Sequence, residues 1–328
     1  MTKPAYIDMA LAPLRPVLQD GIVELCVNPD GCVWTESRGD GHMIASKLRL
    51  GAREAHEALN QMAAEGSVRL SKDHPLGTVS FNYGPWLIRS QLLLPPVVRG
   101  QHAFAMRFFR PESESFDPVY LEGQSLSVSE RRAKLTDNIA KRAETDLQGA
   151  LREAVRAKLN VVVSGGTSSG KTTLARWLVE QVDDSERILT IEDVPDLMPR
   201  QPNKVMMVSK RSSDVRTPDH LLQASLRLRP DRIILSEVTG SDAYTFLKAI
   251  NTGHGGSITT VHADTAELAI ERMAQTALEA PGKMTYKDMV AYVVRSIDII
   301  VQMGKLGDRR GVMEVYQPRR YQLEDIGE

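Results

Sequence analysis

The sequence predicts an α/β fold for the larger, C-terminal part of the chain and a smaller α+β part before it. From residue 160 onward, short apolar segments alternate with segments of helical spacing, which is typical of a mostly parallel sheet covered by helices. Before residue 111, short strands and turns surround one or two helices. The length of 328 residues exceeds what one ordinary hydrophobic core needs, so we expect two domains.

The N-terminal part contains a helix and several strands that the residue pattern marks. Ala55, Leu59 and Met62 repeat at helical spacing and would share one face of a helix. Gly84-Pro85 predicts a turn between two strand-like segments. The predicted elements are a helix over residues 51–65 and strands over residues 79–83, 86–94 and 103–109.

The composition changes between residues 111 and 129. This stretch holds two prolines, one glycine, five serines and four acidic residues, with little periodic apolar content. Such a composition is typical of a linker. We therefore predict an N-terminal domain over residues 1–115, a linker over residues 116–130 and a C-terminal domain over residues 131–328.

The C-terminal part begins with apolar residues four apart over residues 130–158, which predicts a helix interrupted near Gly149. Thr217 and Pro218 form the start signal of a later helix, an N-cap followed by proline at the first position. Strands are predicted over residues 161–164, 188–191, 233–236 and 257–261. Helices are predicted over residues 171–181, 218–228 and 242–251, after Asp264 and from residue 286. A terminal hairpin is predicted from residues 297–303 and 312–316, turning through residues 304–311.

The bulk composition narrows the class of protein. Forty-one basic and 42 acidic residues leave a net charge of −1, which argues against a chain built to coat nucleic acid. Cys26 and Cys32 are too few for a disulfide framework or a metal cluster, so we expect a reducing compartment. No signal peptide and no apolar run near the roughly 20 residues of a membrane span is evident. We expect a cytoplasmic protein, with attachment to a membrane surface left open.

The strongest motif is the segment of residues 165–172, which matches G-x-x-x-x-G-K-[ST] in full and lies between an apolar strand and a helix. Its glycines let successive backbone N–H groups face phosphates, and the helix that follows adds its N-terminal dipole. Lys171 would reach the β- and γ-phosphates of ATP, and the Thr172 hydroxyl would ligate Mg²⁺. The residues predicted to contact the nucleotide here are Gly165, Gly166, Thr167, Ser168, Ser169, Gly170, Lys171, Thr172 and Thr173.

Hydrolysis would also need a carboxylate that orients water and positive charge near the transferring phosphoryl group. Glu192 and Asp193 follow the strand over residues 188–191, and Glu237 follows the strand over residues 233–236. The carboxyl ends of strands are where α/β sheets bind ligands. An acidic residue after a strand is more often a helix cap or a solvated residue, but a P-loop on the same sheet favours a catalytic role.

Two histidines, His254 and His262, bracket the strand over residues 257–261. A zinc site would need further ligands, and no cysteine lies nearby. We interpret the pair as hydrogen-bond donors that sense phosphate. A structural or surface role is the alternative for each.

Four segments in order resemble the Walker A, Asp-box, Walker B and His-box motifs of the secretion or traffic ATPases. They cover residues 165–172, 188–196, 229–237 and 251–263. The likeness spans about residues 145–300 and is greatest to the VirB-eleven type of type IV secretion systems. The resemblance implies a RecA-like C-terminal domain, an N-terminal domain that helps to cover the nucleotide, and a homohexameric ring that uses ATP and Mg²⁺.

The resemblance also implies roles for individual residues. Glu237 would be the catalytic glutamate of Walker B, and Glu192 and Asp193 would support Mg²⁺ and water. His254 and His262 would sense the γ-phosphate or couple it to subunit motion. Arg107 and Arg110, in a strand that resembles the arginine-bearing strand of the family, would contact nucleotide at a subunit boundary, with an ordinary surface salt bridge as the alternative.

Two positions depart from the family pattern. Thr239 stands where an arginine usually follows the Walker B glutamate, so that arginine is lost or replaced from elsewhere, with Arg227 or Arg229 as candidates. Ser168 stands where the loop often has glycine, a replacement that the loop tolerates if φ at this position can be negative. The four-cysteine module of some type II secretion ATPases is missing, which favours the type IV branch.

The leading hypothesis is an ATP-hydrolysing hexameric motor that powers substrate translocation or pilus assembly in type IV secretion or conjugation. Its expected partners are other inner-membrane and ATPase subunits of such a system, at the cytoplasmic face of the inner membrane, without direct binding of nucleic acid. The alternatives are an ATPase of type II secretion, tight adherence or type IV pilus assembly, a nucleic-acid-dependent P-loop motor, a small-molecule phosphotransferase, and a non-hydrolysing assembly factor.

Overall fold

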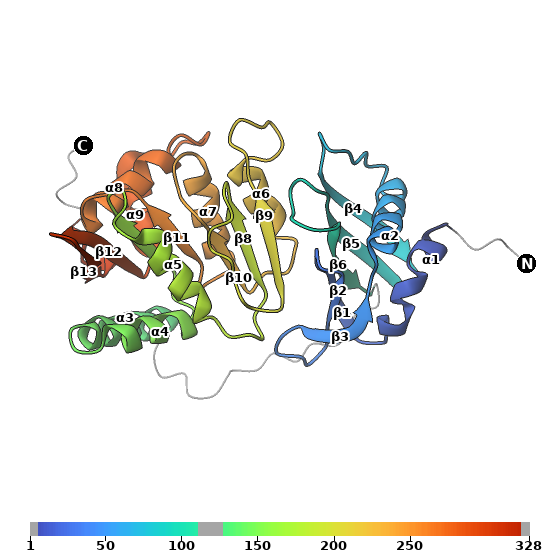
Figure 1. Ribbon diagram of the computed structural model, residues 1–328, viewed down its shortest axis with the longest axis horizontal. Helices are drawn as coiled ribbons and strands as arrows, with labels where there is room; N and C mark the ends of the chain where they lie inside the picture. Colours follow the sequence, from blue (N-terminus) through green and yellow to red (C-terminus); the bar gives the residue numbers. More distant parts are fainter. Residues whose placement is uncertain (1–5, 111–126, 323–328) are drawn as a thin grey trace, which may run out of the picture. The chain divides into compact units, whose positions relative to one another are not determined.

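A computed structural model describes residues 6–110 and 127–322 (Figure 1). It confirms a mixed α/β chain with two sheets. The chain divides into two compact units, one of Met1–Ser113, Asp183–Pro195 and Arg200–Ile233, the other of Glu114–Val182, Asp196–Pro199 and Ile234–Glu328. Most of the predicted linker lies outside the described residues, so the domain division proposed from the sequence stays a prediction.

The first unit is built around a six-stranded antiparallel sheet in the order β3-β2-β1-β6-β5-β4. Its N-terminal elements are α1 Tyr6–Ala10, η1 Ala12–Val17, β1 Ile22–Val27, β2 Cys32–Ser37, β3 Ile44–Arg49, α2 Ala52–Glu65, β4 Leu76–Tyr83, β5 Trp86–Leu93 and β6 Ala103–Phe109. Helix α2 packs on β4 and β5, and Ala55, Leu59 and Met62 are fully buried on its inner face, as predicted. The turn at Gly84-Pro85 is also confirmed, because Tyr83 pairs with Trp86 across it. For the segments of β1, β2 and β3, the sequence predicted short strands without defined bounds.

Three later elements belong to the same unit. These are β8 Ile188–Glu192, β9 Lys204–Val208 and α6 Pro218–Ser225. Strands β8 and β9 pair in parallel, and the Thr217 hydroxyl caps α6 as predicted, accepting from the His220 N–H at 3.2 Å. Strand β9 is absent from the prediction; it has five residues, which alternate between half-buried and buried.

A buried polar cluster ties β1 to the start of β8 and β9 in this unit. Arg187, fully buried just before β8, donates to Asn28 Oδ1 at 2.6 Å, to the Leu228 carbonyl at 2.8 Å and to Asn203 Oδ1. Asn28 follows β1 and donates to Asn203 Oδ1 at 3.0 Å, while Asn203 directly precedes β9. Burial lowers the pKa of Arg187. The guanidinium therefore depends on these neutral oxygens for the solvation that water would otherwise supply.

Asn28→Ala should lower the free energy of unfolding by about 2–4 kcal/mol, because it removes a hydrogen bond to a charged group that stays buried. Urea unfolding followed by tryptophan fluorescence measures this change, with the exposed Asn82→Ala as the matched control. A loss below about 1 kcal/mol, the level of an ordinary surface substitution, would contradict the importance given to this cluster.

The second unit carries the phosphate-loop motif. Its elements are α3 Val128–Ala143, α4 Leu147–Arg156, β7 Val161–Gly165, α5 Lys171–Glu180, α7 Asp242–Asn251, β11 Ile258–Val261, α8 Ala266–Ala277, α9 Tyr286–Ser296, β12 Ile299–Leu306, β13 Arg309–Tyr316 and η2 Pro318–Arg320. Its strands lie in the order β13-β12-β7-β11, and β10 Arg232–Leu235 pairs with β11. Strands β7, β10, β11 and β12 pair in parallel and β13 is added antiparallel, so the predicted mostly parallel sheet is confirmed. Every residue of β7, β10 and β11 is buried, as expected for strands covered on both faces.

The structure corrects two local predictions. The long helical stripe is interrupted at residues 144–146 rather than near Gly149, because Asp146 caps α4 by accepting from the Gly149 N–H at 2.9 Å. Helices α3 and α4 lie side by side as a result (Figure 1). The hairpin turn is also tighter than predicted: Gly304 and Gly311 pair inside the ladder, and the strands turn between Leu306 and Arg309. Among the described helices, none is long and apolar enough to cross a membrane.

Candidate functional site

The segment between β7 and α5 forms the strand–loop–helix arrangement that the motif predicted. A Cβ on Gly165 would lie 2.6 Å from Ser169 Oγ and 2.7 Å from the Met303 carbonyl oxygen, so only glycine fits there. Gly170 has φ of 98° and precedes the first residue of α5, a left-handed position that favours glycine. The loop therefore packs tightly against the end of β12 and opens onto a helix N-terminus.

Ser168 does not meet the condition under which serine would replace glycine without strain. Its φ is +57°, in the left-handed region, instead of negative. A serine occupies this region at a cost of roughly 1–2 kcal/mol relative to the right-handed region. The loop imposes this conformation because a left-handed residue turns successive N–H groups toward one concave side.

Lys171 is the first residue of α5, and its side chain folds back into the loop. The ammonium nitrogen donates to the carbonyl oxygens of Gly165 at 2.8 Å and Gly166 at 2.9 Å, and it lies 3.3 Å from His262 Nδ1. Burial lowers the pKa of Lys171, and the carboxylate of Glu237 opposes that shift. The amine is thus held at the centre of the loop by neutral acceptors that an anion could replace.

Glu237 and His262 follow the neighbouring parallel strands β10 and β11. The Thr260 hydroxyl donates to the Ser236 carbonyl at 2.7 Å, and the Val238 N–H donates to the Thr260 carbonyl at 3.0 Å, which fixes the two strand ends together. His262 Nε2 lies 3.6 Å from Glu237 Oε1, and both side chains are about two-fifths exposed, at 43% and 38%.

His262 therefore stands between Lys171 and Glu237. If Nδ1 accepts from the lysine ammonium, the ring proton is on Nε2, which faces the glutamate. The structure brings together three of the catalytic residues predicted from the sequence, and they share one unit with the loop.

The other predicted histidine, His254, has a different setting. It is half-buried, and its Nδ1 lies 3.2 Å from the Ala249 carbonyl near the end of α7. This contact positions the loop between α7 and β11.

Glu192 and Asp193 follow β8 in the first unit. Glu192 is buried and accepts from the Thr190 hydroxyl at 2.9 Å. Asp193 is exposed, accepts from the Ser209 hydroxyl and lies 3.4 Å from Arg211. Within this unit the two carboxylates differ in access to solvent.

Arg107 in β6 and Arg110 just after it pair with acidic residues of the first unit. Arg107, with 61% of its side chain exposed, lies 3.6 Å from Glu24 Oε1 and 5.3 Å from the Phe109 ring centroid. Burial raises the pKa of Glu24 to about 7, against the opposing effect of Arg107. Arg110 pairs with Asp20. In this structure both arginines make the salt bridges that the sequence left open as the alternative.

Of the two candidates to replace the arginine missing at Thr239, Arg229 is engaged elsewhere. Its guanidinium binds Glu36 at 2.6 Å and also pairs with Asp231. Arg227 is exposed. Arg229 thus serves to hold the segment before β10 against β2.

The loop fits phosphate on an observation independent of the motif. Within the described part of the chain, the buried Ser169 hydroxyl has no hydrogen-bond partner, although it lies inside the loop. Thr172 lies exposed on the first turn of α5. No group of three or more His, Cys, Asp or Glu side chains among the described residues is arranged for a metal. Mg²⁺ in nucleotide sites takes one or two protein ligands and completes its coordination with phosphates and water, so it does not need such a group.

A pocket of about 510 Å³ opens beside the loop. It is lined by Leu147, Gln148, Leu151, Gly170, Thr173, Leu174, Trp177, Met303, Arg310 and Val312. The guanidinium of Arg152 lies 5.5 Å from the Trp177 ring centroid. Sequence reasoning missed this pocket except for its edge at Gly170 and Thr173. The lining residues Gly170, Thr173, Leu174 and Trp177 have the i, i+3, i+4, i+7 spacing of one helix face, which is visible in the sequence. The residues from α4 and the hairpin join them only in the fold.

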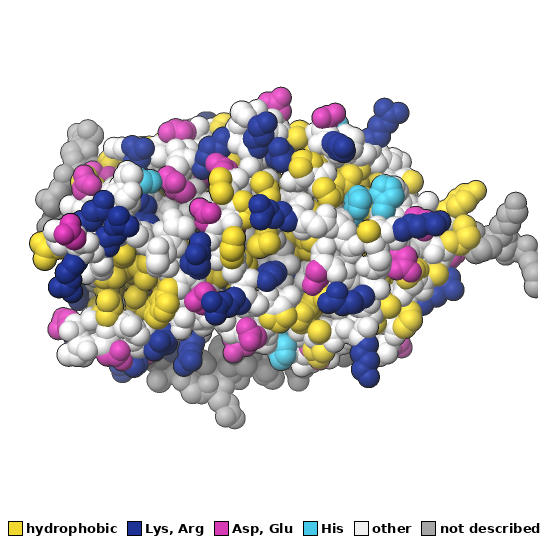
Figure 2. Space-filling model, viewed as in Figure 1, with side chains coloured by type: hydrophobic (Ala, Val, Ile, Leu, Met, Phe, Trp, Pro, Cys, Tyr) yellow, Lys and Arg dark blue, Asp and Glu magenta, His cyan; other side chains and the backbone are white. Residues whose placement is uncertain are grey.

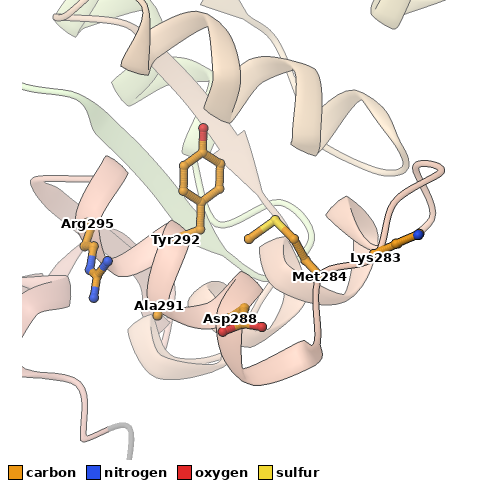
Figure 3. A pocket seen from close by; sticks show the side chains of 6 residues that line it. All are labelled: Lys283, Met284, Asp288, Ala291, Tyr292 and Arg295. Carbon is orange, nitrogen blue, oxygen red and sulfur yellow. The ribbon is translucent and has the colours of Figure 1, made fainter.

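A second pocket, of about 450 Å³, lies along α9 and the segment before it. Its lining residues are Lys283, Met284, Asp288, Ala291, Tyr292 and Arg295. Figure 3 shows Tyr292 and Arg295 extending from α9, with Lys283 and Met284 on the preceding segment. None of the residues predicted to bind nucleotide lines it.

Comparison with known proteins gives three consistent matches. A family model described as "Type II/IV secretion system protein" matches residues 125–305. The type IV secretion system protein VirB11 of Bartonella henselae is 31% identical, over 95% of this chain and 93% of its own length. The conjugal transfer protein TrbB of Rhizobium radiobacter is 33% identical, over 92% of this chain and 87% of its own length.

One solved structure is similar over nearly the whole chain. The VirB11 ATPase from the Brucella suis type IV secretion system, crystallised with sulphate, superposes with a TM-score of 0.82 at 28% identity. The match covers 95% of this chain and 98% of that structure. The likeness thus extends through the N-terminal sheet as well as the loop-bearing unit.

Proposed function

The chain belongs to the type II/IV secretion system protein family and is an ATPase of the VirB11 type, and we propose that it hydrolyses ATP at the loop of residues 165–172 to drive type IV secretion or conjugation. The observation that carries this proposal is the row of contacts from the loop through Lys171 and His262 to Glu237. Lys171 is a cation that can bind phosphate, and Glu237 is a carboxylate that can activate water. These are the two requirements of phosphoryl transfer to water, and both lie at one site.

The loop and α5 would hold the phosphates. Backbone N–H groups of the loop, the N-terminal end of α5 and the unpartnered Ser169 hydroxyl are the donors, and Lys171 exchanges its two carbonyl partners for phosphate oxygens. Thr172 would hold Mg²⁺, which would neutralise charge on the phosphates when bound. A supporting role for Asp193, direct or through water, rests on motif order alone.

Glu237 would orient and activate the attacking water. When Lys171 turns from His262 to phosphate, the Nδ1 atom of His262 loses its partner and the ring is free to respond. His262 thereby links occupancy of the loop to the position of Glu237, the sensing role expected of it.

The pocket beside the loop would take the base and ribose. Gly170 and Thr173 lie at its edge on the first turn of α5, so a nucleotide whose phosphates occupy the loop can extend into it. Trp177 offers a flat apolar surface for a purine, and Gln148 and Arg310 supply polar groups for its edge.

The remaining roles rest on motif order. We propose that Glu192 supports the attacking water, that His254 couples the γ-phosphate to subunit motion, and that Arg107 and Arg110 exchange their intrachain partners for nucleotide of a neighbouring subunit. In this proposal the chain divides at residues 116–130, forms a homohexameric ring, and acts at the cytoplasmic face of the inner membrane with other secretion subunits and without direct binding of nucleic acid. The names of the type IV relatives favour this assembly over type II secretion, tight adherence or pilus assembly.

The test is release of phosphate from ATP with Mg²⁺ and no added acceptor. The proposal predicts ADP and free phosphate in equal amounts, with no dependence on single-stranded DNA. Turnover only with a small-molecule acceptor would indicate a phosphotransferase. Turnover that requires DNA and disappears at raised salt would indicate a nucleic-acid motor. Nucleotide binding without turnover would indicate an assembly factor.

A further inference from the structure

Two histidines outside the nucleotide site lie in contact on the first unit. His56 is on the exposed side of α2, and His102 directly precedes β6. His56 Nδ1 is 3.2 Å from His102 Nε2, and the ring centroids are 4.7 Å apart with a tilt of 57°. Figure 2 shows two touching histidine side chains exposed at the surface, in the region where Figure 1 draws α2.

We propose that His56 and His102 bind a divalent transition-metal cation of the zinc, nickel or copper class. A tetrahedral zinc ion with Zn–N bonds of about 2.0–2.1 Å holds its ligand atoms about 3.3–3.4 Å apart. The two ring nitrogens already stand within about 0.2 Å of that separation. Imidazole ligands select these metals over Mg²⁺ and Ca²⁺, which prefer oxygen.

The backbone that carries each ligand is held by the fold before any metal binds. His56 belongs to α2, whose Ala55 and Leu59 side chains are fully buried in the core of the unit. Next to His102, Gln101 donates through its amide to the Leu50 carbonyl at 3.0 Å and through its backbone N–H to the Pro29 carbonyl at 3.0 Å. Little ordering is therefore left to oppose binding.

The second nitrogen of His56 has a partner of the kind that orients metal-bound histidines. The amide nitrogen of Asn60, one helical turn along α2, lies 2.8 Å from His56 Nε2. In this orientation Asn60 donates to Nε2; when its amide group is rotated by 180°, its oxygen accepts from Nε2–H, which leaves the Nδ1 lone pair for the metal.

Only the neutral form of a histidine ring binds a metal, so binding at this site should weaken as the pH falls. In the metal-free protein, a direct hydrogen bond between the two rings takes the place of the metal. Because no third His, Cys, Asp or Glu joins the pair among the described residues, water would complete the coordination.

The experiment is calorimetric titration of the full-length, chelator-treated protein with ZnCl₂, with MgCl₂ as the reference cation. Wild type should bind zinc at this site, and either His56→Gln or His102→Gln should weaken it by about tenfold or more. His74→Gln, an exposed histidine of the same unit, is the matched control and should leave the affinity unchanged. Asn60→Asp should tighten binding by adding a negative charge beside the ligand.

A second readout separates binding from misfolding. Zinc should raise the thermal midpoint of wild type, and by less in either histidine variant. The proposal is overturned if the histidine variants bind zinc as wild type does, if His74→Gln weakens binding as much as they do, or if wild type binds zinc no better than magnesium. Circular dichroism of each variant confirms the fold, and if one variant misfolds the other decides.

Discussion

Lys171→Ala is expected to weaken ATP binding by about a hundredfold or more. The substitution removes a buried ammonium that the loop holds at its centre, and with it the charge-assisted hydrogen bonds to two phosphates, each contributing roughly 1.5–3 kcal/mol. Titration with a fluorescent ATP analogue measures the effect. Affinity within a few-fold of wild type would show that residues 165–172 do not hold the phosphates.

Two further variants sharpen this test. Lys248→Ala removes an exposed lysine of α7 in the same unit and should leave ATP affinity unchanged. Lys171→Arg keeps the charge, but the larger planar guanidinium does not fit between the carbonyl oxygens of Gly165 and Gly166. It should therefore bind ATP more weakly than wild type and more tightly than Lys171→Ala.

Much of this fold follows from local patterns in the sequence. The buried face of α2, the cap at Thr217 and the strands β7, β10 and β11 could be predicted because each depends on residues within one or two turns of one another. The loop of residues 165–172 was predictable for the same reason. Its strand–loop–helix context is itself local.

The errors arise where distant residues decide the local conformation. The φ of Ser168 is positive because the loop must connect β7 to α5 within a few residues. A rule that considers one residue at a time does not include this constraint. Gly304 reads as part of a turn, yet it pairs with Gly311 in the ladder, where a Cβ would lie 2.5 Å from the Met313 side chain. Close packing against the Met313 side chain across the strands, not turn formation, favours glycine there.

The candidate site divides in the same way. The sequence marked Lys171, Glu237 and His262 as separate features, because a phosphate loop and the ends of parallel strands are recognisable one at a time. Only the pairing of β10 with β11 and of β11 with β7 brings them into one row. The pocket lined by Trp177 and Arg310 was only partly visible in the sequence: the spacing of its residues near α5 indicates one helix face, but the hairpin residues join them only in the fold.

Glu237→Gln tests the central claim that this row hydrolyses ATP. The amide keeps the shape of the side chain but removes the negative charge and the proton acceptor that water requires, so kcat should fall by about 10²–10⁴-fold. Lys171 and the loop are unaltered, so ATP affinity should stay close to that of wild type. Glu279→Gln changes an exposed glutamate beside Gly240, outside the proposed row, and is the control.

The decisive measurement is phosphate release by wild type and Glu237→Gln at saturating ATP and Mg²⁺, with nucleotide binding measured on the same samples. We predict steady release by wild type and by Glu279→Gln, and almost none by Glu237→Gln, although all three bind ATP. Equal release by wild type and Glu237→Gln would contradict the assignment of Glu237 and the hydrolytic mechanism built on it.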